Sequence, residues 1–297
     1  MEKNKPLNLK LDDLQSSINI IKNASFRFIN RDIAMVNSFA QMESILFRTL
    51  QPYRAREGRI IRILRGTAHI SINLIEYTVK EQMIVITPTN SLIELLDISP
   101  DYDFQIIVPD NDFLPVVQNG SLMDSYCMKH GSVLALDEEE WQHTDAFFSL
   151  LWDTLQQTPF RRDVVQYMVT ALLYDIRYLH DRNREAAHSC PSRREEVFQR
   201  FIALVNEHSK HQRTTAFYAD KLFLTPRYLS TVIKEASGQT VMQWINQAVI
   251  LEAKVLLKHS SLLVFQISDE LDFPNPSFFS KFFKRMTGMT PAEYQKR

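Results

Sequence analysis

Two segments near the end of the chain share one pattern of apolar and polar positions at a spacing of 50 residues. The first reads TPRYLSTVIKEASGQT from Thr225, and the second reads NPSFFSKFFKRMTGMT from Asn275. Each begins with a residue whose side chain can cap a helix, followed by proline at the first helical position, where its missing N–H costs nothing. Gly238 and Gly288 then stand where a helix is expected to end. The pattern predicts two equivalent amphipathic helices.

The apolar positions of the two copies recur at helical spacing, so we expect one face of each helix to be buried. These positions are Tyr228, Leu229, Val232 and Ile233 in the first copy, and Phe278, Phe279, Phe282 and Phe283 in the second.

A second match lies upstream, where Ala219–Leu222 corresponds to Ser268–Leu271 at an offset of 49. Each unit is therefore predicted to be helix, short turn, helix, at about 214–238 and about 263–288. In helix-turn-helix proteins the second helix enters the major groove of DNA. The apolar-periodic run from Val241 to Leu257 predicts a bridging helix over 240–257, about 25 Å long at 1.5 Å per residue. Such a bridge could hold two recognition helices near 34 Å apart, about one turn of DNA.

The first part of the chain has a different periodicity. Between residues 34 and 109, short β-branched runs separated by turn-like residues indicate a small barrel or sandwich. From 137 to 180 the apolar spacing becomes helical and predicts a pair of helices, which must pack on the barrel or on a second subunit. We expect a two-domain protein: an N-terminal domain over 1–180, a polar linker over 181–196, and an all-α C-terminal domain over 197–297.

Charge separates the same two parts. The chain has a net charge of −1, but residues 193–297 hold 15 Lys plus Arg against 10 Asp plus Glu, a net charge of +5. The remaining residues hold 19 against 25, a net charge of −6. The basic half is the half with the repeat, as expected of a DNA-binding domain. The excess is modest, so nonspecific attraction alone would be weak, and specific contacts would have to supply much of the affinity.

The compartment is expected to be the cytoplasm. Cys127 and Cys190 are the only cysteines, and their spacing does not suggest a metal site or a disulfide framework. The first residues lack the apolar core of a signal peptide, and we find no apolar run of about 18 residues that would span a membrane.

The C-terminal residues, from about Arg200 to Arg297, resemble the DNA-binding domain of the AraC/XylS family of bacterial transcription regulators. The matching motif residues in the second unit are Phe273, Phe279, Ser280, Lys281, Phe283, Lys284, Gly288, Pro291 and Tyr294; Ala253, Leu256 and Leu257 fit the family's bridging helix. Asp272 stands where the family commonly has Gly, and Val249 where it commonly has Arg. The resemblance implies a DNA-binding dimer, and RNA polymerase is a further partner that it implies. The β-rich half is similar to the family's cupin-like effector and dimerisation domain.

The polar faces of the two predicted recognition helices supply the candidate DNA contacts. For base readout we select Arg227, Ser230, Thr231, Ser277 and Lys281, because Arg and Lys can donate to guanine and Ser or Thr can serve either kind of partner. For the DNA backbone we select Lys234, Lys284 and Arg285, which lie farther along the helices. The alternative for each residue is an ordinary solvated helix face.

Two other sites were weighed in the N-terminal half. A cupin-type metal site would need several histidines and a carboxylate, and the strands offer only His69, so no metal, cofactor or catalytic residue is expected. Arg62 shares a strand face with Ile60 and Leu64, which points it into the predicted barrel. It could bind an anionic effector there, but pairing with a carboxylate such as Glu76 or Glu94 is favoured.

The sequence therefore predicts a DNA-binding transcription regulator controlled by a small molecule. Two alternatives stay open: a cupin-type enzyme fused to a DNA-binding domain, and a regulator controlled by a protein partner or by no ligand.

Overall fold

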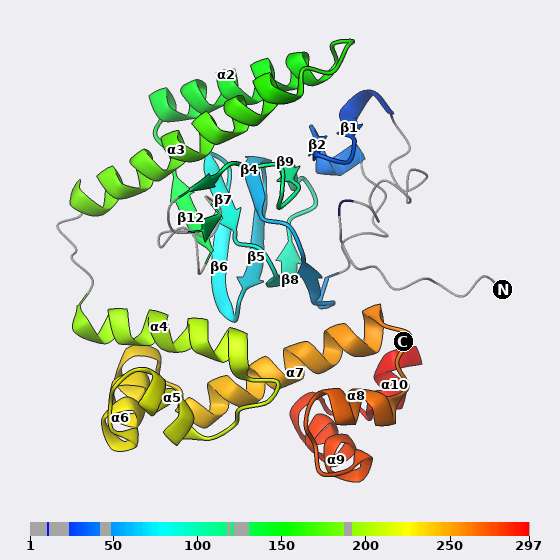
Figure 1. Cartoon of the computed structure of the whole chain (residues 1–297), viewed down its shortest axis with the longest axis vertical. Helices are drawn as coiled ribbons and strands as arrows, with labels where there is room; N and C mark the ends of the chain where they lie inside the picture. The colour runs from blue at the N-terminus through cyan, green and yellow to red at the C-terminus, as the bar shows by residue number, and fades with distance from the viewer. Residues whose placement is uncertain are drawn as a thin grey trace. The chain divides into compact units, whose positions relative to one another are not determined.

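The computed structural model describes residues 11, 24–41, 49–117, 120, 121, 131–186 and 192–296. The chain divides into two compact units, whose main segments are residues 54–190 and 191–297 (Figure 1). Cys127 and Cys190 lie outside the described residues.

The N-terminal unit is β-rich. Its described strands are β1 (Arg27–Ile29), β2 (Ile33–Val36), β3 (Tyr53–Ala55), β4 (Arg59–Arg65), β5 (Thr67–Ile72), β6 (Ile75–Lys80), β7 (Met83–Thr87), β8 (Ser91–Ile98), β9 (Asp103–Pro109), β10 (Val116–Val117), β11 (Gly120–Ser121) and β12 (Ser132–Ala135). Within the described residues they form a six-stranded sheet of order β1-β2-β9-β4-β7-β12, a four-stranded sheet of order β3-β8-β5-β6, and the pair β10-β11. In the six-stranded sheet neighbouring strands pair antiparallel, with Ile60 opposite both Ile86 and Ile107. The β-rich fold predicted from the short apolar runs is confirmed.

Two helices, α2 (Glu138–Leu155) and α3 (Arg162–Ala186), cover one face of the six-stranded sheet. Ile60, Ile84 and Ile107 of the sheet join one buried cluster with Phe148 of α2 and Leu172 of α3. The helical pair thus packs on its own sheet. The sequence had left open whether it packs there or on a second subunit.

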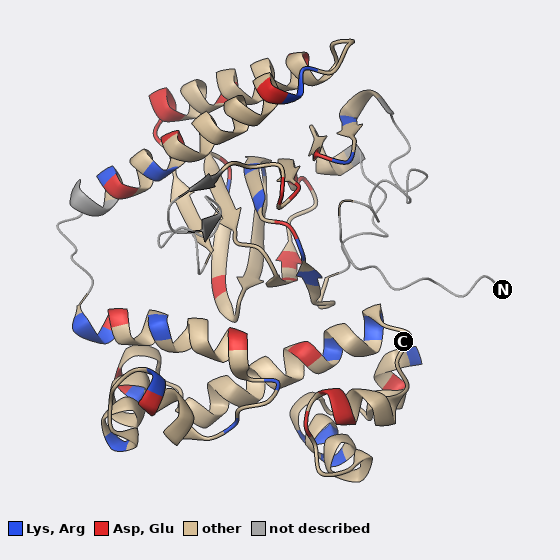
Figure 2. Cartoon of the chain, in the orientation of Figure 1, with Lys and Arg blue, Asp and Glu red and all other residues tan. Residues whose placement is uncertain are grey.

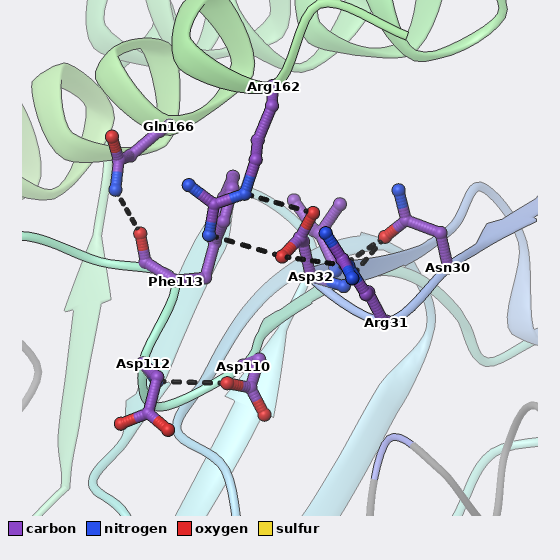
Figure 3. A network of polar contacts seen from close by, with 9 residues as sticks. Asn30, Arg31, Asp32, Asp110, Asp112, Phe113, Arg162 and Gln166 are labelled. Atoms are coloured by element: carbon purple, nitrogen blue, oxygen red, sulfur yellow. Dashed lines mark hydrogen bonds and ion pairs between the residues drawn. The ribbon is translucent and has the colours of Figure 1, made fainter.

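Polar contacts join the start of α3 to the turn between β1 and β2 and to the loop after β9 (Figure 3). The Arg162 guanidinium meets both carboxylate oxygens of Asp32, with its Nε and Nη2 atoms each 3.2 Å from one oxygen. The Gln166 side-chain amide donates to the Phe113 carbonyl. Because the fork of an Arg–carboxylate pair has a fixed geometry, these contacts orient α3 on the sheet.

Arg62 lies beneath α2. Its residue is only 2% exposed, and its Nη1 atom lies 2.5 Å from Asp145 Oδ1 and 3.0 Å from Gln105 Oε1. Its Cζ atom stands 3.6 Å from the centroid of the Trp141 ring. Burial lowers the pKa of Arg62, and the nearby Asp145 carboxylate opposes that shift.

This position of Arg62 differs from the sequence-based expectation. The strand face that Arg62 shares with Ile60 packs against the helices and not between the two sheets, because the helical pair covers that face. Its carboxylate partner is accordingly Asp145 of α2, and not Glu76 or Glu94.

The C-terminal unit is all-α among its described residues. Its helices are α4 (Arg193–His208), α5 (Thr215–Lys221), α6 (Pro226–Ser237), α7 (Val241–His259), α8 (Val264–Glu270), α9 (Pro276–Thr287) and α10 (Pro291–Lys296). Helices α5 and α6 form the first helix-turn-helix unit, α8 and α9 form the second, and α7 joins them (Figure 1). The tandem arrangement predicted from the repeat is confirmed.

The interval between the two units is shorter than the predicted linker over 181–196. Helix α3 continues to Ala186, and α4 begins at Arg193. The Ser192 side chain caps α4 by accepting from the Glu195 N–H, and the Glu195 carboxylate accepts from the Ser192 N–H at 2.6 Å. This capping box stabilises a polar helix start that has no apolar periodicity to predict it.

None of the helices in the described parts of the chain has the length and hydrophobicity that a membrane span needs.

We predict that removing Asp145 destabilises the protein more than removing Arg62. Asp145→Ala leaves the buried guanidinium without its counter-charge and should lower the free energy of unfolding by about 1–3 kcal/mol. Arg62→Met keeps the side-chain volume, removes the buried charge, and leaves an Asp145 side chain that is 55% exposed to water; the change should stay within about 1 kcal/mol.

Denaturant unfolding of the two variants, followed by tryptophan fluorescence, measures both changes. Equal destabilisation, or a larger loss for Arg62→Met, would show that the ion pair is not what holds Arg62 in place.

Candidate nucleic-acid interface

The two second helices of the repeat, α6 and α9, begin and end in the same way. The Thr225 hydroxyl accepts from the Tyr228 N–H, and the Asn275 side-chain carbonyl accepts from the Phe278 N–H. Each helix then has proline in its first turn and ends at a left-handed glycine, Gly238 with φ 70° and Gly288 with φ 79°. A positive φ suits glycine because it has no Cβ. Local sequence therefore sets both boundaries of each helix.

One face of each helix is buried. Leu229, Val232 and Ile233 are at most 2% exposed in α6, and Phe279 and Phe283 are fully buried in α9. Phe283 also packs edge-on against Tyr294 of α10, with ring centroids 5.5 Å apart. Each unit thus has its own apolar core, and the recognition helices are held by it.

Two aromatic residues of the predicted stripes are not buried. Tyr228 is 41% exposed and Phe278 is 60% exposed, although both were predicted to belong to the core. They lie two residues after the N-terminal proline, in the first turn of the helix, where the core no longer covers the side chain. They are functional candidates that the sequence missed, since an exposed aromatic side chain beside polar ones can make apolar contact with a thymine methyl group.

The polar faces of α6 and α9 lie open. All eight residues selected from the sequence are exposed: Arg227, Ser230, Thr231 and Lys234 on α6, and Ser277, Lys281, Lys284 and Arg285 on α9. Figure 2 shows Lys and Arg positions in blue on both helices. Each set lies on one helix, opposite the buried face, so its members can reach one surface together.

Some of these side chains already have partners within the helix. The Ser230 hydroxyl donates to the Pro226 carbonyl at 2.8 Å, and the Thr231 hydroxyl donates to the Arg227 carbonyl at 3.1 Å. Their oxygens remain able to accept a hydrogen bond from a base. Lys234 Nζ lies 2.5 Å from the Gly238 carbonyl and caps the C-terminus of α6. To reach DNA it must leave that carbonyl.

The turn before each recognition helix contains a residue with a left-handed backbone. Phe223 has φ 57° and the equivalent Asp272 has φ 50°. This conformation explains why glycine is common at the position of Asp272, because non-glycine residues are strained there. Phe223 is also 91% exposed.

Possible metal ligands do not cluster in the part of the chain that the structure describes. The described residues contain no group of three or more His, Cys, Asp or Glu side chains that could hold an ion. His69, the strand histidine weighed as a ligand, is exposed, and its Nδ1 atom lies 3.1 Å from the Thr78 hydroxyl.

Comparison with known proteins places the helical region in a family. The family model described as "Helix-turn-helix domain" matches residues 218–297. The transcriptional activator RhaR of Escherichia coli K12 is 27% identical over 144 residues, which cover 48% of this chain and 50% of RhaR. The chain thus spans about half the length of the curated relatives it matches.

Solved structures show weaker likeness. Wild-type ToxT of Vibrio cholerae, bound to an unsaturated fatty acid, aligns over 90% of this chain and 95% of its own, with a TM-score of 0.42 and 17% identity. The DNA-binding domain of AdpA in complex with target DNA aligns over 33% of this chain and 89% of its own, with a TM-score of 0.32 and 23% identity. Likenesses at these scores do not bear on function. The sequence match is the stronger finding: residues 218–297 match the model of a helix-turn-helix domain.

Proposed function

We propose that this chain is a transcription regulator that binds promoter DNA with two tandem helix-turn-helix units. The observation that carries the proposal is the pair of recognition helices α6 and α9. They have the same caps and the same buried faces, and their polar faces are both open. Helix α7, which joins the units, has 19 residues and so spans about 28 Å. That length suits two helices that enter successive major grooves about 34 Å apart.

Base readout is assigned to the first turns of each recognition helix. Arg227 of α6 and Lys281 of α9 can donate to guanine N7 and O6, and Ser277 can donate or accept at the start of α9. The two helices present different side chains, so the DNA site should consist of two unlike half-elements. Lys284 and Arg285 lie farther along α9 and suit phosphate contacts, which position the helix without reading sequence.

We further propose that the chain has no enzymatic role, because its curated relative RhaR is a transcriptional activator. Cytoplasmic action follows from the same proposal.

The N-terminal domain is proposed to receive the signal that controls DNA binding. An effector shifts the protein between states only if it binds those states with different affinity. An anion could bind Arg62 only by displacing Asp145, which lies 2.5 Å from the guanidinium. The existing ion pair therefore favours a neutral effector or a protein partner over an anion at this residue.

We propose that the chain acts as a dimer, joined through the outer face of α3. Val164, Tyr167, Ala171, Tyr174 and Tyr178 are all exposed and follow one another at intervals of three and four residues. Tyr167 is 68% exposed and Tyr178 65%. Apolar and aromatic residues at this spacing form the seam along which two helices pack. The inner face of α3 already covers the sheet, so this outer seam needs another partner.

Charges beside the seam select a second copy of the same helix as that partner. Asp163 lies seven residues before Thr170, and Arg177 lies seven residues after it. If two copies of α3 pack antiparallel about Thr170, each Asp163 lies beside the Arg177 of the partner. The surface is therefore complementary to itself, as a two-fold dimer requires.

We predict that Asp163→Arg weakens the dimer, because it places two arginines together at both ends of the seam. The double variant Asp163→Arg, Arg177→Asp restores both ion pairs with exchanged signs and should restore the dimer. Sedimentation equilibrium measures the dissociation constant of each variant. A monomeric wild-type chain, or a dimer that neither variant changes, would contradict the assigned seam.

We predict that Lys281→Ala and Lys284→Ala weaken DNA binding in different ways. Loss of a base contact at Lys281 should cost about 1–3 kcal/mol and relax specificity at one base pair. Loss of a phosphate contact at Lys284 should weaken binding to all sequences alike and lower the salt slope by about one.

Titrations of both variants over single-base variants of a selected site, at several salt concentrations, make the comparison. If Lys281→Ala weakens all sequences alike, Lys281 contacts phosphate and is not a base reader. If neither variant changes binding, α9 is not at the DNA.

A further inference from the structure

The loop between α4 and α5 contacts the turn of the second helix-turn-helix unit. His211 Nδ1 lies 2.6 Å from Asp272 Oδ2, and because a carboxylate accepts only, the ring N–H donates. The Arg213 guanidinium donates to the Leu271 carbonyl, and its Cζ atom lies 4.0 Å from the centroid of the Phe273 ring. The partners are 61 and 58 residues apart along the chain. These contacts join the start of the first unit to the turn that precedes α9.

The same loop is fastened to the first unit and to the bridge. Tyr218 of α5 is fully buried, and its hydroxyl donates to the Gln212 carbonyl at 2.7 Å. Lys210 Nζ lies 3.7 Å from Glu252 Oε2 on α7, and that carboxylate is itself buried. A loop held at both of these places can transmit the position of one unit to the other.

Asp272 makes this link where glycine could not. Its backbone φ of 50° is the conformation that favours glycine. A glycine would relieve the strain but would have no carboxylate for His211. In the first unit, Phe223 occupies the equivalent position with φ 57°, and its side chain is 91% exposed. The two turns share a backbone shape, and only the second uses its side chain to reach the α4–α5 loop.

We propose that His211, Arg213 and Asp272 form a strut that fixes the second recognition helix relative to the first, and so sets the spacing of half-elements that the protein accepts. The inference rests on the proposed function, because it concerns how tandem units read DNA. All three are positioning residues, since they lie outside α6 and α9.

The strut fixes the distance and rotation between α6 and α9, and these must match the spacing of the two half-elements on DNA. Inserting one base pair between two half-elements moves the second by about 3.4 Å and turns it by about 34° around the axis. Helix α7 sets the separation of the units, but a single helix can bend gently along its length. A second connection that does not run through α7 restricts that bending. The protein with an intact strut should therefore tolerate fewer spacings.

The test uses the full chain and a DNA site selected from random sequence. The site is rebuilt with one base pair removed and with one or two added between its halves. For the wild type, we expect binding to fall by about tenfold or more for each change of spacing, a loss of ~1.4 kcal/mol. For Asp272→Gly, which removes the carboxylate and keeps the turn, and for His211→Ala, we expect this discrimination to fall to about threefold.

Two further variants sharpen the result. Phe223→Gly makes the matched change in the first turn without touching the strut, and should keep the wild-type preference for spacing. The double variant His211→Ala, Asp272→Gly should match the single variants, because all three remove the same link. If the strut variants keep the wild-type preference while circular dichroism shows them folded, the proposal is wrong.

A measurement without DNA separates this inference from the proposed function. Spin labels on α6 at Glu235 and on α9 at Arg285, with Cys127 and Cys190 replaced by serine, report the distance between the recognition helices. We expect a broader distance distribution in Asp272→Gly and His211→Ala than in the wild type or Phe223→Gly. Unchanged distributions would overturn the strut. Failure to select any DNA site would overturn the proposed function alone.

Discussion

The burial of helix α7 is the constraint on which the DNA-binding half depends. Its first half includes Trp244, which packs against Phe198 of α4 with ring centroids 5.5 Å apart. Its second half supplies Ile250, Ala253 and Leu257 to the core that contains Phe279 and Phe283. Each residue of a helix turns the chain by about 100°, so neither core can shift along α7 without losing its buried face. The two recognition helices are therefore both positioned by α7.

The recognition helices were predictable because short-range interactions determine where they begin and end. Capping by Thr225 and Asn275, proline in the first turn and a left-handed glycine at the end act over a few residues, so sequence alone located α6 and α9. Periodicity also separated their faces, but it could not show where the core ends. Tyr228 and Phe278 fit the apolar stripe and yet lie exposed, because burial at a helix end depends on neighbours that periodicity does not describe.

Contacts between distant residues were beyond that reasoning. Strand alternation placed Arg62 on one face of its sheet, but it could not show which layer covers that face. The partner, Asp145, lies 83 residues away along the chain. The link from His211 to Asp272 also joins distant segments, 61 residues apart, and an aspartate where glycine is common did not indicate a partner for its side chain. The exposed face of α3 could not be distinguished from its inner face until the sheet occupied one of them. The DNA contacts assigned to α6 and α9 stay predictions.

The central claim is that one chain reads two half-elements through α6 and α9. Hydroxyl-radical footprinting of the full chain on a selected DNA site tests it most directly, because protection reports which grooves are covered at single-nucleotide resolution. The account predicts two protected regions per bound chain, centred about 10 base pairs apart on the same face of the DNA. A single protected region per chain, or two regions on opposite faces, would contradict it.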